Sequence, residues 1–258
     1  MMRKFFILLG MLLFFSTCAE SKDIRFVQVT ETLYSPSNAK ALQQCVEDIN
    51  TLKNLDFVVF TGDNIASAKK ENLRGFLKVV KGLKPKTYIV IGDRDVSKEK
   101  GLNKDAYREE CFKYLGFGQS LSSNYVFKKK GLVFIVVDGA KEFVTATNGY
   151  YKQDTLDWLD KKLTKYAKKK VVILQHFPLQ DCAESQKNTY KSQLYKDLLL
   201  EHDNILAIIS GHFGANSEQV FEDKMHIITP SYASSKIYKV FDIPMTKDYV
   251  YTQLRRVE

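Results

Sequence analysis

The chain has 258 residues, of which 45% are hydrophobic and 27% are charged, and its formal net charge is +9. This length allows one large domain with a sizeable core, whereas the low content of 13 Gly and 5 Pro excludes collagen-like and Pro/Gly-rich disordered proteins. Four Cys without a Cys-x-x-Cys pair exclude a disulfide-scaffolded miniprotein, a zinc ribbon and thioredoxin-like redox chemistry.

The N-terminus has the pattern of a signal peptide, which we predict over residues 1–18. Arg3 and Lys4 precede a run of 11 apolar residues, which is shorter than the ~20 residues that span a bilayer as a helix. Cys18 follows this run in a way that resembles the lipobox of bacterial lipoproteins, which indicates an exported protein with a lipid anchor on Cys18 in a membrane. Ordinary cleavage after Ala19 is the alternative, and it would leave a periplasmic or extracellular protein.

From residue 23 to residue 258, apolar strand-like runs alternate with amphipathic helical patterns, which predicts a single α/β domain. The C-terminal third contains only short strand-like runs and is expected to be rich in β-structure. In chain order we expect strands at 24–30, 56–61, 87–91, 125–128, 132–137, 170–174, 205–210, 219–222, 226–229, 237–242 and 249–255, and helices at 38–52, 73–83, 104–115, 153–166 and 190–201.

Three cysteines, Cys45, Cys111 and Cys182, belong to the part of the chain that would remain after export. Because their number is odd, at least one thiol stays unpaired, and the sequence leaves open which pairs form. Cys45 falls within a helical pattern and is expected to be a core residue.

The positive charge is spread along the chain. Removal of residues 1–17 would take away Arg3 and Lys4 and lower the net charge from +9 to +7. Lysine runs at 128–130 and 168–170 adjoin expected strands, and we interpret them as solvated turns. No basic helix face with interleaved aromatic residues occurs, so we expect no nucleic-acid partner. The surplus charge would favour anionic substrates or anionic lipid headgroups.

Polar clusters follow five of the expected strands. One such cluster alone is ordinary turn chemistry, and an isolated His is more often structural than functional. Five such clusters in succession favour a functional site, because binding and catalytic sites of α/β proteins lie at the carboxyl ends of the strands. Acids and histidines brought there together indicate a metal site with oxygen and nitrogen ligands. The clusters are Thr30-Glu31-Thr32, Gly62-Asp63-Asn64, Gly92-Asp93-Arg94-Asp95, Gln175-His176 and Gly211-His212.

The order and spacing of these clusters resemble the calcineurin-like metallophosphoesterases, particularly the purple-acid-phosphatase-like and cyclic-nucleotide phosphodiesterase branch. That family reads D-x-H, G-D, G-N-H-D/E, H and G-H-x-H, each after a strand, and the resemblance runs from about Phe26 to Pro230. The segment 56–63 and the 153–159 segment with Trp158 add support. The resemblance implies an α/β (α+β) fold, a four-layer αββα sandwich of two mixed β-sheets flanked by helices.

The resemblance also implies that one metal site is intact. One ion of the family is held by the Asp that bridges both metals, the Asn of G-N-H, the lone His and the first His of G-H-x-H. These positions are occupied here by Asp63, Asp93, His176 and His212. Two carboxylates and two imidazoles suit Zn²⁺, Mn²⁺ or Fe²⁺, so one tightly bound divalent ion is expected.

The second metal site of the family has lost ligands in this chain. Glu31 and Leu33 stand where the family has the Asp and His of D-x-H, and Gly214 stands where it has the last His. Both imidazoles are therefore missing, and a second ion is expected to be weakly bound or absent. Glu31 and Asp63 together offer oxygen ligands for a hard cation at this position.

Arg94 stands where the family has the His of its G-N-H motif. The resemblance implies a catalytic position beside Asp63 and near the leaving group. A guanidinium would stabilise phosphoryl charge there but cannot donate a proton. In the alternative interpretation, Arg94 forms an ion pair with Glu31, Asp93 or Asp95 and fills the site without any metal.

Two functional hypotheses follow. The first is an exported, divergent metallophosphoesterase that hydrolyses a phosphomonoester or phosphodiester with one intact metal site. The second is a catalytically inactive relative that acts as a binding or structural lipoprotein of the cell envelope. The substrate and the oligomeric state stay open. Two further histidines have ordinary interpretations, because His202 is expected at a helix end on the surface and His226 is expected within the core.

Overall fold

The structure is a computed structural model that describes residues 23–116, 119–144, 146–221 and 224–258. The predicted signal peptide and Cys18 lie outside the described residues. Within the described ranges, no helix is both long enough and apolar enough to cross a bilayer.

All of the predicted helices and strands are present, with ends that differ by a few residues. The short helix α6 and the 3₁₀ turns at Pro36–Asn38 and Ser185–Lys187 are not predicted, because a single turn has no periodic pattern. The helices are α1 (Ala39–Ile49), α2 (Lys70–Val80), α3 (Lys104–Leu115), α4 (Gln153–Lys165), α5 (Ser192–Leu200) and α6 (Tyr232–Ser235). The strands are β1 (Ile24–Val29), β2 (Phe57–Thr61), β3 (Lys86–Val90), β4 (Tyr125–Lys129), β5 (Leu132–Val136), β6 (Val171–Leu174), β7 (Ile205–Ser210), β8 (Ser217–Phe221), β9 (Lys224–Ile228), β10 (Ile237–Ile243) and β11 (Tyr251–Arg256).

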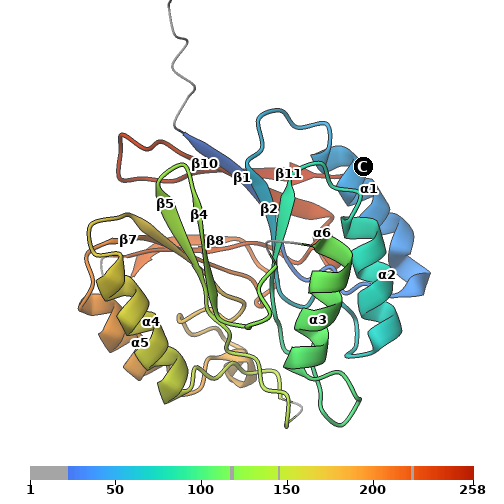
Figure 1. The fold of residues 1–258 in the computed structure, drawn as a ribbon, viewed down its shortest axis with the longest axis horizontal. Helices are drawn as coiled ribbons and strands as arrows, with labels where there is room; N and C mark the ends of the chain where they lie inside the picture. Colours follow the sequence, from blue (N-terminus) through green and yellow to red (C-terminus); the bar gives the residue numbers. More distant parts are fainter. Residues whose placement is uncertain (1–22, 117–118, 145, 222–223) are drawn as a thin grey trace, which may run out of the picture.

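Two mixed sheets pack face to face. The first has the strand order β11-β10-β1-β2-β3, and the second has the order β4-β5-β6-β7-β9-β8. The helices α1, α2 and α3 lie outside the first sheet, and α4 and α5 lie outside the second (Figure 1). The predicted four-layer αββα sandwich is therefore confirmed.

The core explains why the strands are nearly continuous apolar runs. Alternate residues of β1 point to opposite faces, so Phe26 packs between the sheets and Val27 packs under the helices. Phe26 stacks on Phe57 at a centroid distance of 4.6 Å and on Phe241 at 4.7 Å, and it meets Phe134 edge-on at 5.7 Å. These rings therefore pack the two sheets against each other.

Glu110 on α3 is a buried acid that three cations surround. Its side chain is 1% exposed, and Arg74 donates hydrogen bonds to it at 2.9 and 3.2 Å, while Lys70 and Lys113 lie 3.3 and 3.4 Å away. Hydrogen bonding from Arg74 lowers the pKa of Glu110 to about 2, and Lys70 adds to this shift although burial opposes it. A pKa lowered by folding adds stability above the unfolded value of about 4.3, and this contribution disappears as the pH falls toward the folded value.

We therefore expect Glu110→Gln to lower the free energy of unfolding by about 1–3 kcal/mol at neutral pH. The loss should shrink progressively below about pH 4, because the carboxylate of the unfolded chain becomes protonated there, and it should vanish near the folded pKa of about 2. Urea unfolding at neutral pH and at about pH 3 measures both values. Glu109→Gln, on the exposed side of the same helix, is the control and should change neither. A deficit that is equal at both pH values would contradict the ionic origin of the effect.

Candidate metal centre

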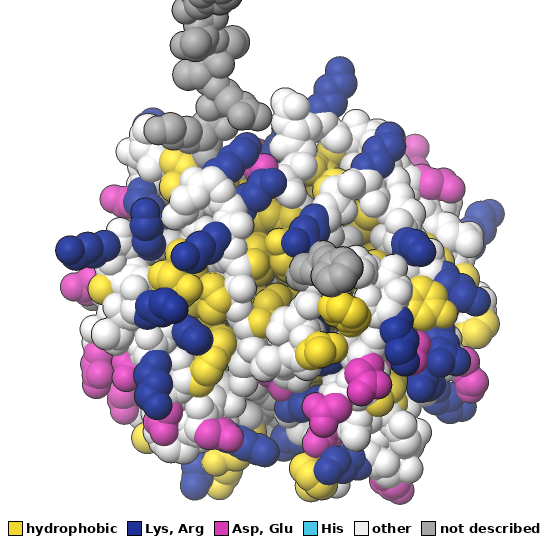
Figure 2. Space-filling view, in the orientation of Figure 1, with side chains coloured by type: hydrophobic (Ala, Val, Ile, Leu, Met, Phe, Trp, Pro, Cys, Tyr) yellow, Lys and Arg dark blue, Asp and Glu magenta, His cyan; other side chains and the backbone are white. Residues whose placement is uncertain are grey.

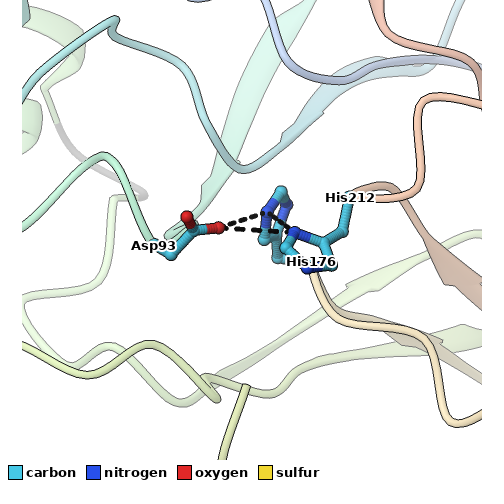
Figure 3. A group of neighbouring side chains, drawn as sticks. All are labelled: Asp93, His176 and His212. Atoms are coloured by element: carbon cyan, nitrogen blue, oxygen red, sulfur yellow. Dashed lines mark hydrogen bonds and ion pairs between the residues drawn. The ribbon is translucent and has the colours of Figure 1, made fainter. Parts of the chain in front are cut away.

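The five polar clusters meet at one end of the sandwich. Strands β1, β2 and β3 run parallel in the first sheet, and β5, β6 and β7 run parallel in the second. The carboxyl ends of the parallel strands of both sheets lie at this same end, so the residues that follow β3 in one sheet and β6 and β7 in the other face one another. Figure 3 shows Asp93, His176 and His212 converging on a common point from these three loops.

Three potential ligand atoms lie at mutual contact distances. Asp93 Oδ1 is 3.3 Å from His176 Nε2 and 3.3 Å from His212 Nδ1, and the two nitrogens are 3.1 Å apart. Four ligands arranged tetrahedrally around an ion at about 2.0–2.1 Å are about 3.3–3.4 Å from one another. Asp93 Oδ1 is buried and neither of its imidazole contacts has hydrogen-bond geometry. The three side chains therefore fit a divalent transition metal.

Both imidazoles are oriented by backbone carbonyls on their far sides. His176 Nδ1 lies 2.7 Å from the carbonyl oxygen of Thr61, and His212 Nε2 lies 3.2 Å from that of Lys187. Because a carbonyl oxygen only accepts, these nitrogens carry the hydrogens, which leaves the lone pairs of His176 Nε2 and His212 Nδ1 facing the centre. Two lone pairs and a carboxylate oxygen at one point require a positive charge between them, either a proton or a metal ion.

The electrostatics of this cluster favour such a positive charge. Although burial favours a neutral imidazole, the carboxylates of Asp63 and Asp93 raise the pKa of His176 to about 10. Burial alone would raise the pKa of Asp93, but the two imidazoles hold it below its ordinary value. Burial and the neighbouring His176 lower the pKa of His212. A metal ion entering the centre would therefore meet an ionised Asp93 and an unprotonated His212, and it would displace the proton that the raised pKa keeps on His176.

Asp63 lies beside this set but is engaged by Arg94. The backbone N–H of Arg94 donates to Asp63 Oδ1 at 2.9 Å, and the guanidinium Nε lies 3.3 Å from Asp63 Oδ2. Asp63 Oδ1 is also 3.6 Å from His176 Nε2. The alternative prediction for Arg94 named the wrong partners, because its guanidinium pairs with Asp63 and not with Glu31, Asp93 or Asp95. The role of Asp63 as a metal ligand stays a prediction.

The positions of the lost second site lie in the loops that follow β1 and β7. Glu31 Oε1 is buried and has no hydrogen-bond partner among the described residues. Leu33 is half-buried, and its N–H donates to the carbonyl of Asp63 at 3.0 Å. A Cβ on Gly214 would meet only Ser231 Cβ, at 4.0 Å, so this position is open. The orphaned oxygen of Glu31 is compatible with the predicted weak oxygen-ligand site.

Backbone strain is concentrated in these loops. Of the eight non-glycine residues with positive φ in the described chain, four belong to them: Glu31 (51°), Leu33 (45°), Asp63 (52°) and His212 (72°). A left-handed conformation is unfavourable for such residues and persists where the surrounding structure enforces it, most often at functional sites. Gly62 has φ +94°, and a Cβ there would collide with the imidazole of His176. The close approach of β2 and His176 thus requires glycine.

Asp95 connects the loops that carry Asp63 and Asp93. Its Oδ1 accepts hydrogen bonds from the backbone N–H groups of Asn64 and Ile65, at 2.8 and 3.1 Å. Its Oδ2 accepts from the N–H of Gly92 at 2.8 Å and from the side chain of Asn64 at 3.0 Å. One buried carboxylate therefore holds both loops at fixed positions.

A cavity of about 620 Å³ opens beside Asp93 and Arg94, which is large enough for a small organic phosphate. Lys141, which follows β5, lines it and donates a hydrogen bond to Asn148 Oδ1 at 2.6 Å. Burial lowers the pKa of Lys141, and the charge of Asp93 opposes that shift. Lys141 is not among the residues predicted from the sequence, although it follows an expected strand and polar residues after strand ends build sites. Lys100 also lines the cavity, so its charge favours anions.

The remaining sequence predictions have clear outcomes. Cys45, Cys111 and Cys182 are all free thiols, and Cys45 is a core residue as expected. His226 is buried as expected. His202 is only partly a surface residue, because its Nε2 lies 2.8 Å from Asp160 Oδ1 on α4 and its side chain is largely covered.

Comparisons with known proteins show the family and the fold of this chain. A sequence model of the family described as calcineurin-like phosphoesterase matches residues 24–214, which include every candidate ligand. A probable glycerophosphodiester phosphodiesterase, GpdQ, of Arcobacter nitrofigilis is 26% identical over 203 residues, which cover 77% of this chain and 71% of that protein. A probable cyclic nucleotide phosphodiesterase of Fibrobacter succinogenes is 22% identical over 237 residues, which cover 83% and 82%. The crystal structure of a dimetal phosphatase from Danio rerio superposes with a TM-score of 0.71 at 15% identity, covering 91% of this chain and 96% of that one.

Proposed function

This chain belongs to the calcineurin-like phosphoesterase family, and from that premise we propose that it hydrolyses a phosphodiester with one tightly bound divalent transition metal. The family consists of dimetal enzymes. The observation that carries the one-metal proposal is the contrast between two carboxylates. Asp93 Oδ1 points at two imidazole lone pairs, whereas Asp63 is engaged by Arg94. The phosphodiesterase names of two relatives favour a diester over a monoester substrate.

Asp93, His176 and His212 would hold the ion, with Asp63 as the proposed fourth ligand. Carboxylate and imidazole ligands suit Zn²⁺, Mn²⁺ and Fe²⁺ alike. When bound, such an ion would act as a Lewis acid on a phosphoryl oxygen and would activate water for attack on phosphorus.

Arg94 and Lys141 would bind the anionic substrate in the adjoining cavity. The Arg94 side chain is 53% exposed, so its guanidinium can contact a phosphoryl oxygen while its Nε stays near Asp63. A guanidinium remains charged throughout the reaction, so Arg94 would stabilise negative charge on the phosphoryl group, and the leaving group would take its proton from water. Lys141 would contact the part of the substrate that extends along the cavity.

We expect Lys141→Met to raise the KM for an activated diester, such as bis(4-nitrophenyl) phosphate, by about 10–100-fold, because a hydrogen bond to a charged group is lost. The kcat should change much less, since Lys141 would bind ground state and transition state alike. Steady-state kinetics on the metal-loaded protein measures both constants. Lys40→Met, on the exposed face of α1, is the control and should alter neither. An unchanged KM would remove Lys141 from the substrate site.

The inactive relative remains the second candidate, and one observation favours it. The backbone N–H of Arg94 donates to one carboxylate oxygen of Asp63, and its guanidinium pairs with the other. Asp63 is therefore compensated without a second ion. Turnover of the same diester by protein loaded with one equivalent of Mn²⁺, Zn²⁺ or Fe²⁺ distinguishes the candidates. Tight binding of one ion without turnover would favour the binding protein.

We also propose that the protein is exported and carries a lipid anchor on Cys18, a proposal that the N-terminal sequence alone supports. The mass of the N-terminal peptide tests it, because ordinary cleavage would give a free N-terminus at Glu20.

A further inference from the structure

Seven lysines gather at the end of the sandwich where the parallel strands begin, and we call this group the basic end. The β4–β5 hairpin and the segment between α4 and β6 carry them, and Val133 N–H donates to the carbonyl of Lys170 at 3.1 Å, which joins the two segments. In Figure 1 the hairpin tip lies at the top, and in Figure 2 dark-blue side chains predominate over the upper half of the same face. The basic end consists of Lys128, Lys129, Lys130, Lys165, Lys168, Lys169 and Lys170.

Most of the charge of the basic end is not neutralised. Lys129 and Lys130 pair with Asp56 at 3.4 and 3.1 Å, and Lys170 pairs with Asp248 at 2.6 Å. The other four lysines have no acidic partner among the described residues, and they line a single cavity of about 530 Å³: Lys128, Lys165, Lys168 and Lys169. Confining four like charges around one hollow is unfavourable unless anions lie against it.

Aromatic and apolar atoms lie among these ammonium groups. The Nζ of Lys128 lies 4.7 Å from the centroid of the Tyr166 ring, and that of Lys165 lies 5.8 Å from it. Ala167, in the same cavity wall, is exposed. Tyrosine with surrounding lysines is typical of surfaces that contact lipid headgroups, because the ring sits at the interface while ammonium groups bind phosphates.

The start of the described chain lies at the same end. Lys130 Nζ donates to the carbonyl of Asp23 at 3.0 Å, so the first described residue touches the basic end. Cys18 is five residues earlier, and five extended residues reach at most about 17–18 Å. A bilayer that held an acyl chain on Cys18 would therefore lie within about two Debye lengths of Lys130.

We propose that the basic end is a docking surface for the anionic phospholipid headgroups of a bilayer. The negative surface potential of such a bilayer attracts lysines that lie within a Debye length of it. Docking by this end leaves the opposite end, with Asp93 and Arg94, directed away from the lipid. The proposal does not depend on phosphoesterase activity, since no residue of the basic end lines the cavity beside the metal set.

The test compares the mature chain, as isolated from the cells that export it, on vesicles of two compositions. One contains phosphatidylglycerol and phosphatidylcholine at about 1:2, and the other contains phosphatidylcholine alone. Acetylation by an amine-reactive ester, followed by peptide mass spectrometry, reports the accessibility of each lysine. We expect the four lysines without an acidic partner to be acetylated about fivefold more slowly on the anionic vesicles than on phosphatidylcholine alone. This protection should vanish near 0.5 M NaCl. Lys100 and Lys191, at the opposite end, should be labelled equally on both.

Charge-reversal variants separate docking from a general effect of net charge. One triple variant is Lys128→Glu, Lys168→Glu and Lys169→Glu. The matched control has the same change of charge at three exposed lysines of helix starts: Lys40→Glu, Lys69→Glu and Lys191→Glu. Only the first should abolish the protection of Lys165, and an unchanged melting temperature confirms that both are folded.

Equal labelling on the two kinds of vesicle would overturn the proposal. The same follows if both triple variants lose protection to the same extent, because the effect would then come from net charge. A third outcome would also overturn the proposal: millimolar inorganic phosphate protects the four lysines when no vesicles are present, and adding anionic vesicles gives no further protection. That result would indicate a site for a free anion.

Discussion

Substitution of His212 by alanine is expected to remove the tightly bound metal and, with it, the hydrolytic activity. His212 Nδ1 is one of three ligand atoms that lie 3.1–3.3 Å from one another, and its Nε2 is fixed by the carbonyl of Lys187. Loss of one imidazole from such a set should weaken binding by at least about a hundredfold, because even outer hydrogen-bond partners of metal ligands are worth 10–100-fold. Elemental analysis after dialysis measures the metal content without reference to activity.

His226→Gln supplies the matched control, since His226 is also a buried imidazole but lies on β9 and belongs to no ligand group. It should keep close to one metal per chain. His176→Ala should behave like the His212 variant, although His176 is completely buried and its removal adds a cavity. Metal retained in full by the folded His212 variant would show that this set is not the binding site. Two tightly bound ions in the natural protein would contradict the proposal of a single tight site.

Restoring the second site is expected to raise metal binding from one ion to two and to raise the hydrolysis of an activated diester at least tenfold. Tenfold corresponds to ~1.4 kcal/mol off the barrier, a modest share of what a second ion contributes by clamping the phosphoryl group. Arg94 must be replaced along with the missing ligands, because its guanidinium now lies against Asp63 Oδ2. The variant combines Glu31→Asp, Leu33→His, Arg94→His and Gly214→His.

The structure has room for these changes. A Cβ at Gly214 meets nothing closer than 4.0 Å, and Leu33 is only half-buried. Both positions have a positive φ. Replacing Gly214 by histidine in this conformation costs about 1 kcal/mol of folding stability. The melting temperature of the variant must therefore be measured first. The variant that keeps Arg94 but carries the other three changes is the control, and it should bind the second ion more weakly. A folded variant that holds two ions but hydrolyses no faster would show that the pocket, not the ligand loss, limits catalysis.

The fold could be predicted because its strands carry strong local signals. β2 and β5 are buried on both faces, so they read as short apolar runs between turns, and α1 and α2 bury one face each and read as amphipathic helices. The shared strand direction within each sheet, together with the way the two sheets pack, then places the residues after β3, β6 and β7 at one end of the sandwich. The approach of Asp93, His176 and His212 therefore follows from the fold, without knowledge of any side-chain conformation.

The detailed arrangement of the centre could not be predicted in the same way. The guanidinium of Arg94 pairs with Asp63 and not with its sequence neighbours Asp93 and Asp95. Asp95 already accepts four hydrogen bonds, and Asp93 faces the two imidazoles. These assignments depend on which partner each oxygen meets in three dimensions. The Lys187 carbonyl that orients His212 lies 25 residues away, at the end of a 3₁₀ turn without a sequence motif, so no sequence pattern predicts this contact.

The hydrogen bonds of Asp95 have a consequence for how the centre responds to thermal motion. Since one carboxylate is shared by the loops after β2 and β3, a displacement of either loop carries the other along, and the separation between Asp63 and Asp93 hardly changes. An entering ion therefore meets the loops of Asp63 and Asp93 already in place, and these two loops need little reorganisation on its arrival or departure. Exchange of one divalent ion for another should therefore proceed without a slow movement of these two loops.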